Sequence, residues 1–275
     1  MTDALNHRPS MHVSEDVLTW PIPAQPQAAR AAVTVHCFAG AGEAGSYIAD
    51  SIARALHDAI DTRGQALWLG CGGSTPKAVY GHLVHAGLDW RDITLVQSDE
   101  RFVATDDANS NTRMMTEALG PVLSGPGRAG GMAFISLIQD LSDAATCAAK
   151  AEARLFKLGG GEAPVYDFAL LGMGPDGHFA SIFPRHPINA FVYDTKALVV
   201  PVKAAHDGSE PVLPRLTLSV PALNRCRRIV FYITGQAKLD VLRRASLDAD
   251  PMTSPIGAFL AQCPVPVEFV WTVST

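Results

Sequence analysis

The sequence predicts an α/β fold, a three-layer Rossmann-like domain whose sheet is mostly parallel. Short apolar runs typical of buried strands alternate along the chain with segments whose apolar residues recur at helical spacing. Several of these runs end directly in glycine-rich or charged loops, as strands of a parallel sheet do before a crossover helix. The two observations together indicate one sheet covered by helices on both faces.

The length and composition fit such a domain. The chain has 275 residues, of which 48% are hydrophobic, so it can bury a large core. We expect a loose, polar and proline-bearing N-terminal arm over residues 1–31, followed by a single α/β domain over residues 32–275. The net charge of −5 and the absence of any run of basic residues argue against a nucleic-acid surface.

The cysteines and the N-terminus indicate where the protein works. The five cysteines are scattered without CxxC spacing, which fits reduced thiols better than disulfides or a zinc site. The N-terminus has no apolar signal segment, and no stretch is apolar for long enough to cross a membrane. We therefore expect a cytoplasmic protein that binds neither nucleic acid nor a membrane. The sequence leaves its oligomeric state open between a monomer and a small homo-oligomer.

The first half of the predicted domain alternates regularly between strands and helices. Apolar residues at i, i+3 and i+4 spacing predict the helices, and short runs bounded by turn residues predict the strands. The expected order is strand 33–38, a helix that ends at Gly64, strand 65–71, a helix that begins near Pro76, strand 92–97 and helix 109–119.

The second half continues this pattern after a loop over residues 120–131. Because the alternation resumes unchanged, this segment is interpreted as a loop and not as a linker between domains. The expected order is strand 132–138, helix 143–158, strands 168–171 and 197–202, a short helix through Leu223, strand 228–234, a helix that contains Lys238 and strand 267–273.

Four of the predicted strands end in polar motifs. In a parallel sheet, right-handed crossovers bring such ends to one edge, which is where ligands bind. Chance helix capping would not favour a single edge, so the sequence predicts a shared site. The motifs are GGSTP after strand 65–71, SDER after strand 92–97, GMGPDGH after strand 168–171 and TGQAK after strand 228–234.

The first motif is suited to an anion. Gly72, Gly73, Ser74 and Thr75 join a strand to the N-terminus of a helix, where backbone N–H groups, hydroxyls and the positive end of the helix dipole converge. An ordinary tight turn is the alternative interpretation. The spacing is neither GxGxxG nor the Walker pattern, so it indicates neither a dinucleotide nor ATP.

Two further motifs carry charged side chains. Arg101 could hold a phosphate through its bidentate fork, with Asp99 or Glu100 orienting it, although a surface ion pair is the alternative. After the glycine turn in the third motif, Asp176 and His178 are a plausible general-base pair. The alternative is that the aspartate caps the next helix and the histidine packs or faces solvent.

Read in order, these motifs resemble the 6-phosphogluconolactonase family. That family belongs to a wider group that contains glucosamine-6-phosphate deaminase and ribose-5-phosphate isomerase, with a sugar-phosphate isomerase/CoA-transferase-like fold. The matching stretches are 69–83, 93–103 followed by 109–111 and Arg113, and then 170–184, 214–223 and 233–242.

The resemblance implies hydrolysis of 6-phospho-D-glucono-1,5-lactone to 6-phospho-D-gluconate, in the oxidative pentose phosphate pathway, with no cofactor and no metal. The substrate would be a small phosphorylated sugar lactone. The resemblance makes His178 the residue that activates water, with Asp176 beside it. Contacts to the phosphate and the sugar are expected from Gly72, Gly73, Ser74, Thr75, Asp99, Arg101, Gly174, Arg215 and Lys238.

Some residues depart from the family pattern, and two other functions are weighed against it. Phe179 stands where the family usually has threonine, and the stretch before Arg215 lacks an expected basic residue. A glucosamine-6-phosphate deaminase/isomerase usually reads Phe-Asn-Glu-Pro after its histidine, whereas this chain reads Ser-Ile-Phe-Pro over 181–184, without the ring-opening glutamate. A non-catalytic sugar-phosphate sensor is usually joined to a helix-turn-helix segment, which the short, proline-bearing arm does not supply.

Overall fold

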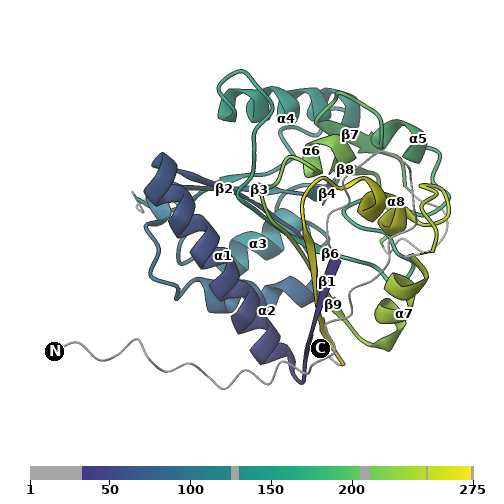
Figure 1. The fold of residues 1–275 in the computed structure, drawn as a ribbon. Coiled ribbons are helices and arrows are strands. Elements are labelled where there is room, and N and C mark those ends of the chain that lie inside the picture. The colour runs from purple at the N-terminus through teal and green to yellow at the C-terminus, as the bar shows by residue number, and fades with distance from the viewer. Residues whose placement is uncertain (1–32, 125–129, 205–210, 246, 274–275) are drawn as a thin grey trace.

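A seven-stranded parallel sheet forms the centre of the structure, a computed structural model that describes residues 33–124, 130–204, 211–245 and 247–273 (Figure 1). All pairings between its strands are parallel, which confirms the predicted fold class. The predicted N-terminal arm, 1–31, lies outside the described residues. In spatial order the strands are β1 (Val33–Phe38), β10 (Val267–Thr272), β9 (Ile229–Thr234), β6 (Phe168–Gly172), β2 (Ala66–Gly70), β3 (Ile93–Gln97) and β5 (Ala133–Ile135).

Helices cover both faces of this sheet. Side chains alternate along β2, so that Trp68 packs under one set of helices while Leu67 and Leu69 pack under the other. One face is covered by α1 (Ala41–Arg63), α2 (Ser74–Leu83) and α3 (Asn111–Leu119), and the other by α4 (Ala144–Leu158), α5 (Asn189–Val192), α6 (Val220–Leu223), α7 (Gln236–Ala245) and α8 (Pro255–Gln262).

Local residues set the ends of several helices as the sequence predicts. Ser110 caps α3 by accepting a hydrogen bond from the backbone of Arg113, and Asp143 caps α4 in the same way through Thr146. Gly64 ends α1 in the left-handed conformation, with φ of 74°.

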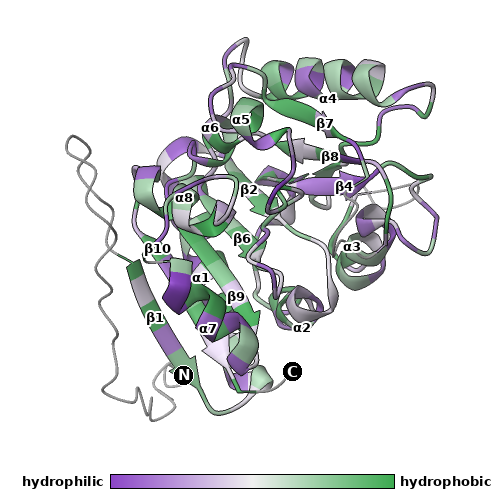
Figure 2. Cartoon of the chain, turned by 90° about the vertical axis from the view of Figure 1, so that its right-hand side faces the viewer, coloured by the Kyte–Doolittle hydropathy of each residue, from purple (hydrophilic) through white to green (hydrophobic). Residues whose placement is uncertain are grey.

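A second, three-stranded antiparallel sheet lies beside the helices of the second face. It consists of β4 (Asp99–Arg101), β8 (Arg215–Leu218) and β7 (Val199–Val202). The charged β4 stands out in purple against the green strands of the main sheet (Figure 2). The strand predicted at 197–202 therefore belongs to this sheet and not to the parallel one. A short apolar run does not reveal its pairing partner, because strands of both sheets are buried here.

The order of the main sheet reverses between β2 and β6. From β2 the chain proceeds outward through β3 to β5, and from β6 it proceeds in the other direction through β9 to β10. Open α/β sheets bind ligands in the crevice at such a switch point. The four strands that carry the polar motifs are the contiguous neighbours β9, β6, β2 and β3, which places their loops around this point.

Within the described ranges, no helix combines the length and apolar character needed to cross a bilayer. The same ranges gather no group of three or more histidine, cysteine, aspartate or glutamate side chains able to hold a metal. All five cysteines lie within them and carry free thiols, as their spacing in the sequence predicts.

Candidate active site

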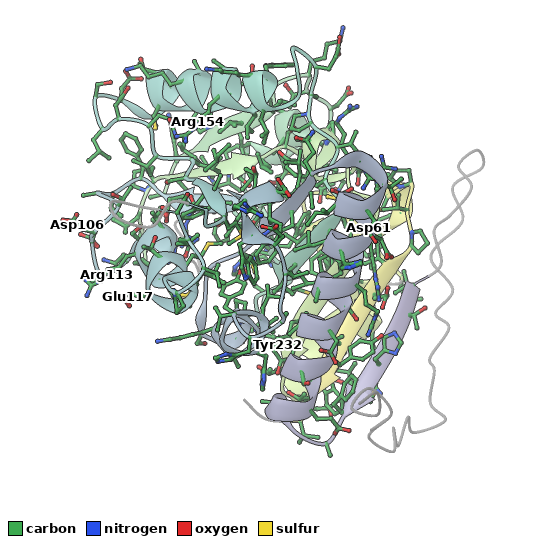
Figure 3. The ribbon with its side chains drawn as sticks, turned by 90° about the vertical axis from the view of Figure 1, so that its left-hand side faces the viewer. Asp61, Asp106, Arg113, Glu117, Arg154 and Tyr232 are labelled. Atoms are coloured by element: carbon green, nitrogen blue, oxygen red, sulfur yellow. The ribbon has the colours of Figure 1, made fainter. Side chains whose placement is uncertain are left out.

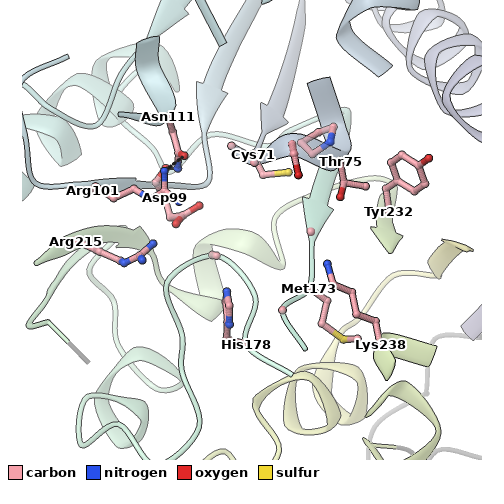
Figure 4. A pocket seen from close by; sticks show the side chains of 17 residues that line it. Cys71, Thr75, Asp99, Arg101, Asn111, Met173, His178, Arg215, Tyr232 and Lys238 are labelled. Carbon is pink, nitrogen blue, oxygen red and sulfur yellow. Dashed lines mark hydrogen bonds between the residues drawn. The ribbon is translucent and has the colours of Figure 1, made fainter. Parts of the chain in front are cut away.

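A pocket of about 240 Å³ lies at the carboxyl ends of β2, β3, β6 and β9 (Figure 4). Asp176 is the one predicted site residue outside its lining, and it contacts the pocket through His178. The structure thus brings the predicted residues together, while their roles remain predictions. Those that line the pocket are Gly72, Gly73, Ser74, Thr75, Asp99, Arg101, Gly174, His178, Arg215 and Lys238.

The first wall of the pocket is the loop that starts α2. Gly73 occupies the N-cap position with φ of 108°, a conformation that residues with a side chain rarely adopt. The helix begins at Ser74, earlier than predicted, and no side chain caps it. The N–H groups of its first turn and the hydroxyls of Ser74 and Thr75 therefore border the pocket without a capping bond between them. This geometry suits an anion.

Two contacts hold this loop in place. A Cβ on Gly72 would lie 1.9 Å from Oδ1 of Asn111, so only glycine lets the loop pack against α3. The buried hydroxyl of Tyr80 donates to the carbonyl of Cys71 at 2.6 Å and accepts from the Cys71 amide at 3.1 Å. Burial raises the pKa of both the Cys71 thiol and the Tyr80 hydroxyl, so neither is a nucleophile at neutral pH.

The Asp176 and His178 side chains meet directly, a point that their spacing in the sequence left open. Oδ1 of Asp176 lies 2.6 Å from Nδ1 of His178 and also accepts from the His178 backbone at 3.2 Å. Burial alone would raise the pKa of Asp176, but the hydrogen bond and charge of His178 outweigh it and lower that pKa. The carboxylate is ionised at neutral pH and can only accept, so Nδ1 carries a proton, and in the neutral form of the imidazole the lone pair is on Nε2.

Gly174 makes this pairing possible. A Cβ at that position would lie 2.2 Å from Nδ1 of His178 and 2.6 Å from Oδ1 of Asp176. Its backbone N–H also donates to the carbonyl of His178 at 2.8 Å, which closes the turn. The glycine of the motif is therefore required by the close approach of the acid and the imidazole.

Two arginines stand at one end of the pocket. Arg101 on β4 is directly opposite Arg215 on β8 in the antiparallel ladder. Like charges in this position repel. Arg215 is only 4% exposed, and burial lowers its pKa. Nε of Arg101 is buried without a hydrogen-bond partner among the described residues. Asp99, in the same pocket, offsets part of this repulsion, and an anionic or developing negative charge between the two guanidinium groups would offset more of it.

Asn111 orients Arg101, in place of the expected Asp99 or Glu100. Its Oδ1 and the carbonyl of Asn109 each accept from Nη1 of Arg101 at 2.8 Å. Its Nδ2 donates to the carbonyl of Asp99 at 3.1 Å. The sequence places Asn111 in a stretch that resembles the family and at the start of a helix, but it does not reveal this contact with Arg101, which depends on how α3 packs against β4.

The two acidic residues serve other contacts. Glu100 is fully buried against the N-terminus of α3, where it accepts from the backbone of Asn111 at 2.7 Å and from the hydroxyl of Thr112 at 2.7 Å. Asp99 accepts from the hydroxyl of Ser181 at 2.7 Å. Glu100 therefore fixes the helix that presents Asn111, and Asp99 joins β4 to the loop after His178.

Phe179 is explained by the core. It is fully buried, and its ring packs at 4.8 Å from Phe259 and 6.0 Å from Phe231. The next residue, Ala180, has φ of 46°, which turns the chain so that Phe179 points into the core while Ser181 reaches Asp99. The hydroxyl that the family usually carries at position 179 is replaced here by a packing side chain that does not line the pocket.

The other end of the pocket is formed by Lys238, Thr75 and Tyr232 (Figure 4). Burial lowers the pKa of Lys238. Tyr232 also lines the pocket, a position that the sequence does not indicate because this tyrosine lies within an apolar strand. Arg113 and Glu117 by contrast form an ion pair of 2.9 Å on the outer side of α3, outside the pocket lining (Figure 3).

Comparison with known proteins shows which family this chain and its fold are similar to. Residues 41–271 match the model of the family described as glucosamine-6-phosphate isomerases/6-phosphogluconolactonase. The 6-phosphogluconolactonase of Rhizobium meliloti is 34% identical and is covered over 97% of its length by 86% of this chain. That of Caulobacter vibrioides is 35% identical, with 79% of this chain and 88% of the relative covered. The crystal structure of a 6-phosphogluconolactonase from Shewanella baltica superimposes with a TM-score of 0.77 at 33% identity, over 86% of this chain and 97% of that one.

Proposed function

The chain belongs to the family of glucosamine-6-phosphate isomerases and 6-phosphogluconolactonases, and we propose that it hydrolyses 6-phospho-D-glucono-1,5-lactone to 6-phospho-D-gluconate, a step of the oxidative pentose phosphate pathway. The observation that carries this proposal is the 2.6 Å contact between Asp176 and His178 at the wall of a pocket with cationic groups at both ends. A phosphorylated lactone has a phosphate at one end and an ester carbonyl at the other, and so matches this charge distribution.

We assign the substrate phosphate to the end formed by the α2 loop and Lys238. Backbone N–H groups at a helix N-terminus, two hydroxyls and one ammonium group form a typical phosphate site. The lactone carbonyl then lies toward His178 and the pair Arg101 and Arg215, so we propose that Arg101 acts on the carbonyl in place of the phosphate contact expected from the sequence. The remote phosphate supplies binding energy that positions the carbonyl for attack.

The residues at this end can carry the whole reaction. Nε2 of His178 takes a proton from water as the water oxygen attacks C1 of the lactone, and the carbonyl π electrons move onto its oxygen. The two guanidinium groups stabilise the negative charge that develops there. The C1–O5 bond then breaks, and the proton held by His178 passes to O5. The products are the opened sugar hydroxyl and an acid group that ionises to the carboxylate.

Asp176 takes part in the proposed reaction by controlling the protonation of His178. Its hydrogen bond keeps the proton on Nδ1, so that Nε2 is the basic atom, and its negative charge stabilises the imidazolium that forms. Ester hydrolysis by activated water consumes no electrons and transfers no group, so we propose that the reaction uses no cofactor. The free thiols favour a reducing compartment, and on that ground we place the enzyme in the cytoplasm.

A deaminase of amino-sugar phosphates is the competing activity. The glutamate expected in that branch is replaced by Phe183, whose buried ring packs at 4.7 Å from the ring of His178. No carboxylate can act from that position. This contact favours lactone hydrolysis over ring opening.

The test is hydrolysis of freshly prepared 6-phosphogluconolactone, measured as the rate above spontaneous hydrolysis, with glucosamine-6-phosphate deamination assayed in parallel. We expect strong lactonase activity, no deamination and a much lower kcat/KM for gluconolactone, which lacks the phosphate. Deamination without lactonase activity would refute the proposal. Equal kcat/KM for the two lactones would refute the assignment of the phosphate end.

A further inference from the structure

Phe183 joins two residues of the site that come from different sheets. Its ring is 1% exposed and lies 4.7 Å, at an interplanar angle of 40°, from the ring of His178 on the loop after β6. Cζ of Arg215, on β8, lies over the same ring, 5.2 Å from its centroid. Phe183 does not line the pocket itself. It therefore contacts both groups while contributing no surface to the pocket.

Resting on the proposed function, we propose that Phe183 is a positioning residue of the hydrolysis. Its ring serves as a shared support that sets the plane of the His178 imidazole and holds the Arg215 guanidinium at the carbonyl end of the pocket. The amino-sugar branch is expected to carry a glutamate at position 183. In this chain Phe183 would not transfer a proton there but would position His178 and Arg215.

The histidine needs such a support. The hydrogen bond from Nδ1 to Asp176 limits rotation of the imidazole about its Cβ–Cγ bond, but a single hydrogen bond still allows the ring to rock about that orientation. Contact with an aromatic ring restricts that rocking. The direction of the Nε2 lone pair, and so its alignment with an attacking water, then depends on Phe183.

The arginine needs it for a different reason. Arg215 is buried directly opposite Arg101, so its charge loses water and meets a like charge, which the nearby Asp99 only partly offsets. The face of an aromatic ring attracts a guanidinium group, and most strongly where water is excluded. Phe183 offsets part of the cost of burying this charge and, together with the hydrogen bond from Nη2 to the carbonyl of Pro211 at 3.2 Å, restricts the guanidinium before substrate binds.

The backbone around Phe183 is itself anchored. The fully buried Asn189 donates from Nδ2 to the carbonyl of Phe183 and to the carbonyl of Pro251, both at 2.8 Å. The ring is therefore fixed to the scaffold and not only to the two residues that it supports. This is what a positioning role requires.

The structure offers a matched control for a test. Phe168 is also fully buried and also carries an arginine over its ring, with Cζ of Arg228 at 5.6 Å, but it does not line or support the pocket. The test compares the F183L and F168L variants, each made in the full chain. We expect kcat for the lactone to fall about 10-fold and KM to rise several-fold in F183L, from loss of the aromatic contacts, with both constants near wild type in F168L. F183Y, which keeps the ring, should recover most of the kcat.

The contact between Phe183 and Arg215 can also be tested by measuring binding affinity, which does not require the reaction to proceed. Calorimetry compares 6-phosphogluconate with glucitol 6-phosphate, which has a hydroxymethyl group in place of the carboxylate. We expect F183L to weaken binding of 6-phosphogluconate about 10-fold more than binding of glucitol 6-phosphate. In an R215M background, F183L should no longer change this ratio. If F183L does not fold, F183M, which also fills the space without a ring, takes its place.

The outcomes separate the inference from the proposed function. If the wild type hydrolyses the lactone and F183L matches F168L in kcat, KM and the binding ratio, the positioning role is refuted and the function stands. If the wild type does not hydrolyse the lactone, the proposed function fails, and the binding ratio alone decides whether Phe183 positions Arg215. A binding ratio that still changes in the R215M background would refute the coupling through Arg215.

Discussion

The two ends of strand β6 each carry an aspartate, and the two carboxylates have opposite surroundings. At the amino end, Asp167 is 6% exposed and accepts from Arg63 at 2.6 Å and from the backbone of Leu67 at 2.9 Å, with Arg227 at 3.3 Å. At the carboxyl end, the side chain of Asp176 is 30% exposed, and His178 is its partner.

The difference shows that the aspartate at one end of β6 stabilises the fold, while the aspartate at the other end contacts the proposed catalytic histidine. The oxygens of Asp167 are occupied by donors that keep their protons at all ordinary pH values, so this carboxylate joins α1, β2 and the segment before β9. Asp176 contacts an imidazole, a group that can both take and give a proton during a reaction. Four variants or conditions would break or sharpen this contrast.

The largest effect is expected from removal of the base at the carboxyl end. His178→Ala should lower kcat for the lactone at least ~10²-fold, since general-base catalysis usually contributes that much. The side chain of His178 is 25% exposed, so the fold should be retained. Steady-state kinetics with circular dichroism as the control checks both points. Near-wild-type turnover in the folded variant would remove His178 from the mechanism.

Asp176→Asn should lower kcat by about 10- to 10²-fold, less than loss of the histidine itself. The amide can donate to Nδ1 and so favour the tautomer whose Nε2 carries a proton. Since Asp176 does not line the pocket, KM should change little. The measurement is the ratio of kcat to KM effects. A variant that raises KM with kcat intact would show that Asp176 binds substrate instead.

Asp167→Asn should affect stability and leave catalysis alone. The asparagine can still accept from the backbone of Leu67, and Arg63 and Arg227 reach solvent, so we expect the free energy of unfolding to fall by only about 1–2 kcal/mol. Urea denaturation measures this loss, and kcat per folded molecule should equal that of the wild type. A clear fall in kcat would contradict the separation between the two ends.

The smallest effect is expected in acid. His178 lowers the pKa of Asp176 below its unfolded value of about 3.9, so this pairing stabilises the fold above that pH and is lost as the pH falls through the lower folded pKa. Thermal unfolding from neutral pH down to the pH range below that value should therefore show a shallower loss of stability in Asp176→Asn than in the wild type. Identical slopes would mean that the pair does not contribute.

Much of the site could be predicted because its residues follow strands directly. Gly72, Gly174 and His178 lie in loops whose position is set once each apolar run is assigned to a parallel strand. The contacts of Asn111 and Phe183 could not be predicted in this way. Each contact depends on the packing of elements that are distant in sequence. An asparagine at a helix start and a phenylalanine in an apolar stretch are common, so neither indicates a contact with a site residue.

The sequence by itself determined the α/β class, the strands of the main sheet and the edge at which its polar loops gather, because hydrophobic periodicity and chain direction are local properties. The tertiary structure decided that β4, β7 and β8 form a separate antiparallel sheet, which sets Arg101 opposite Arg215. It also decided that Asp176 touches His178 and that Phe183 supports both His178 and Arg215. Pairing and side-chain contact depend on which surfaces meet in space, and no pattern along the chain specifies that.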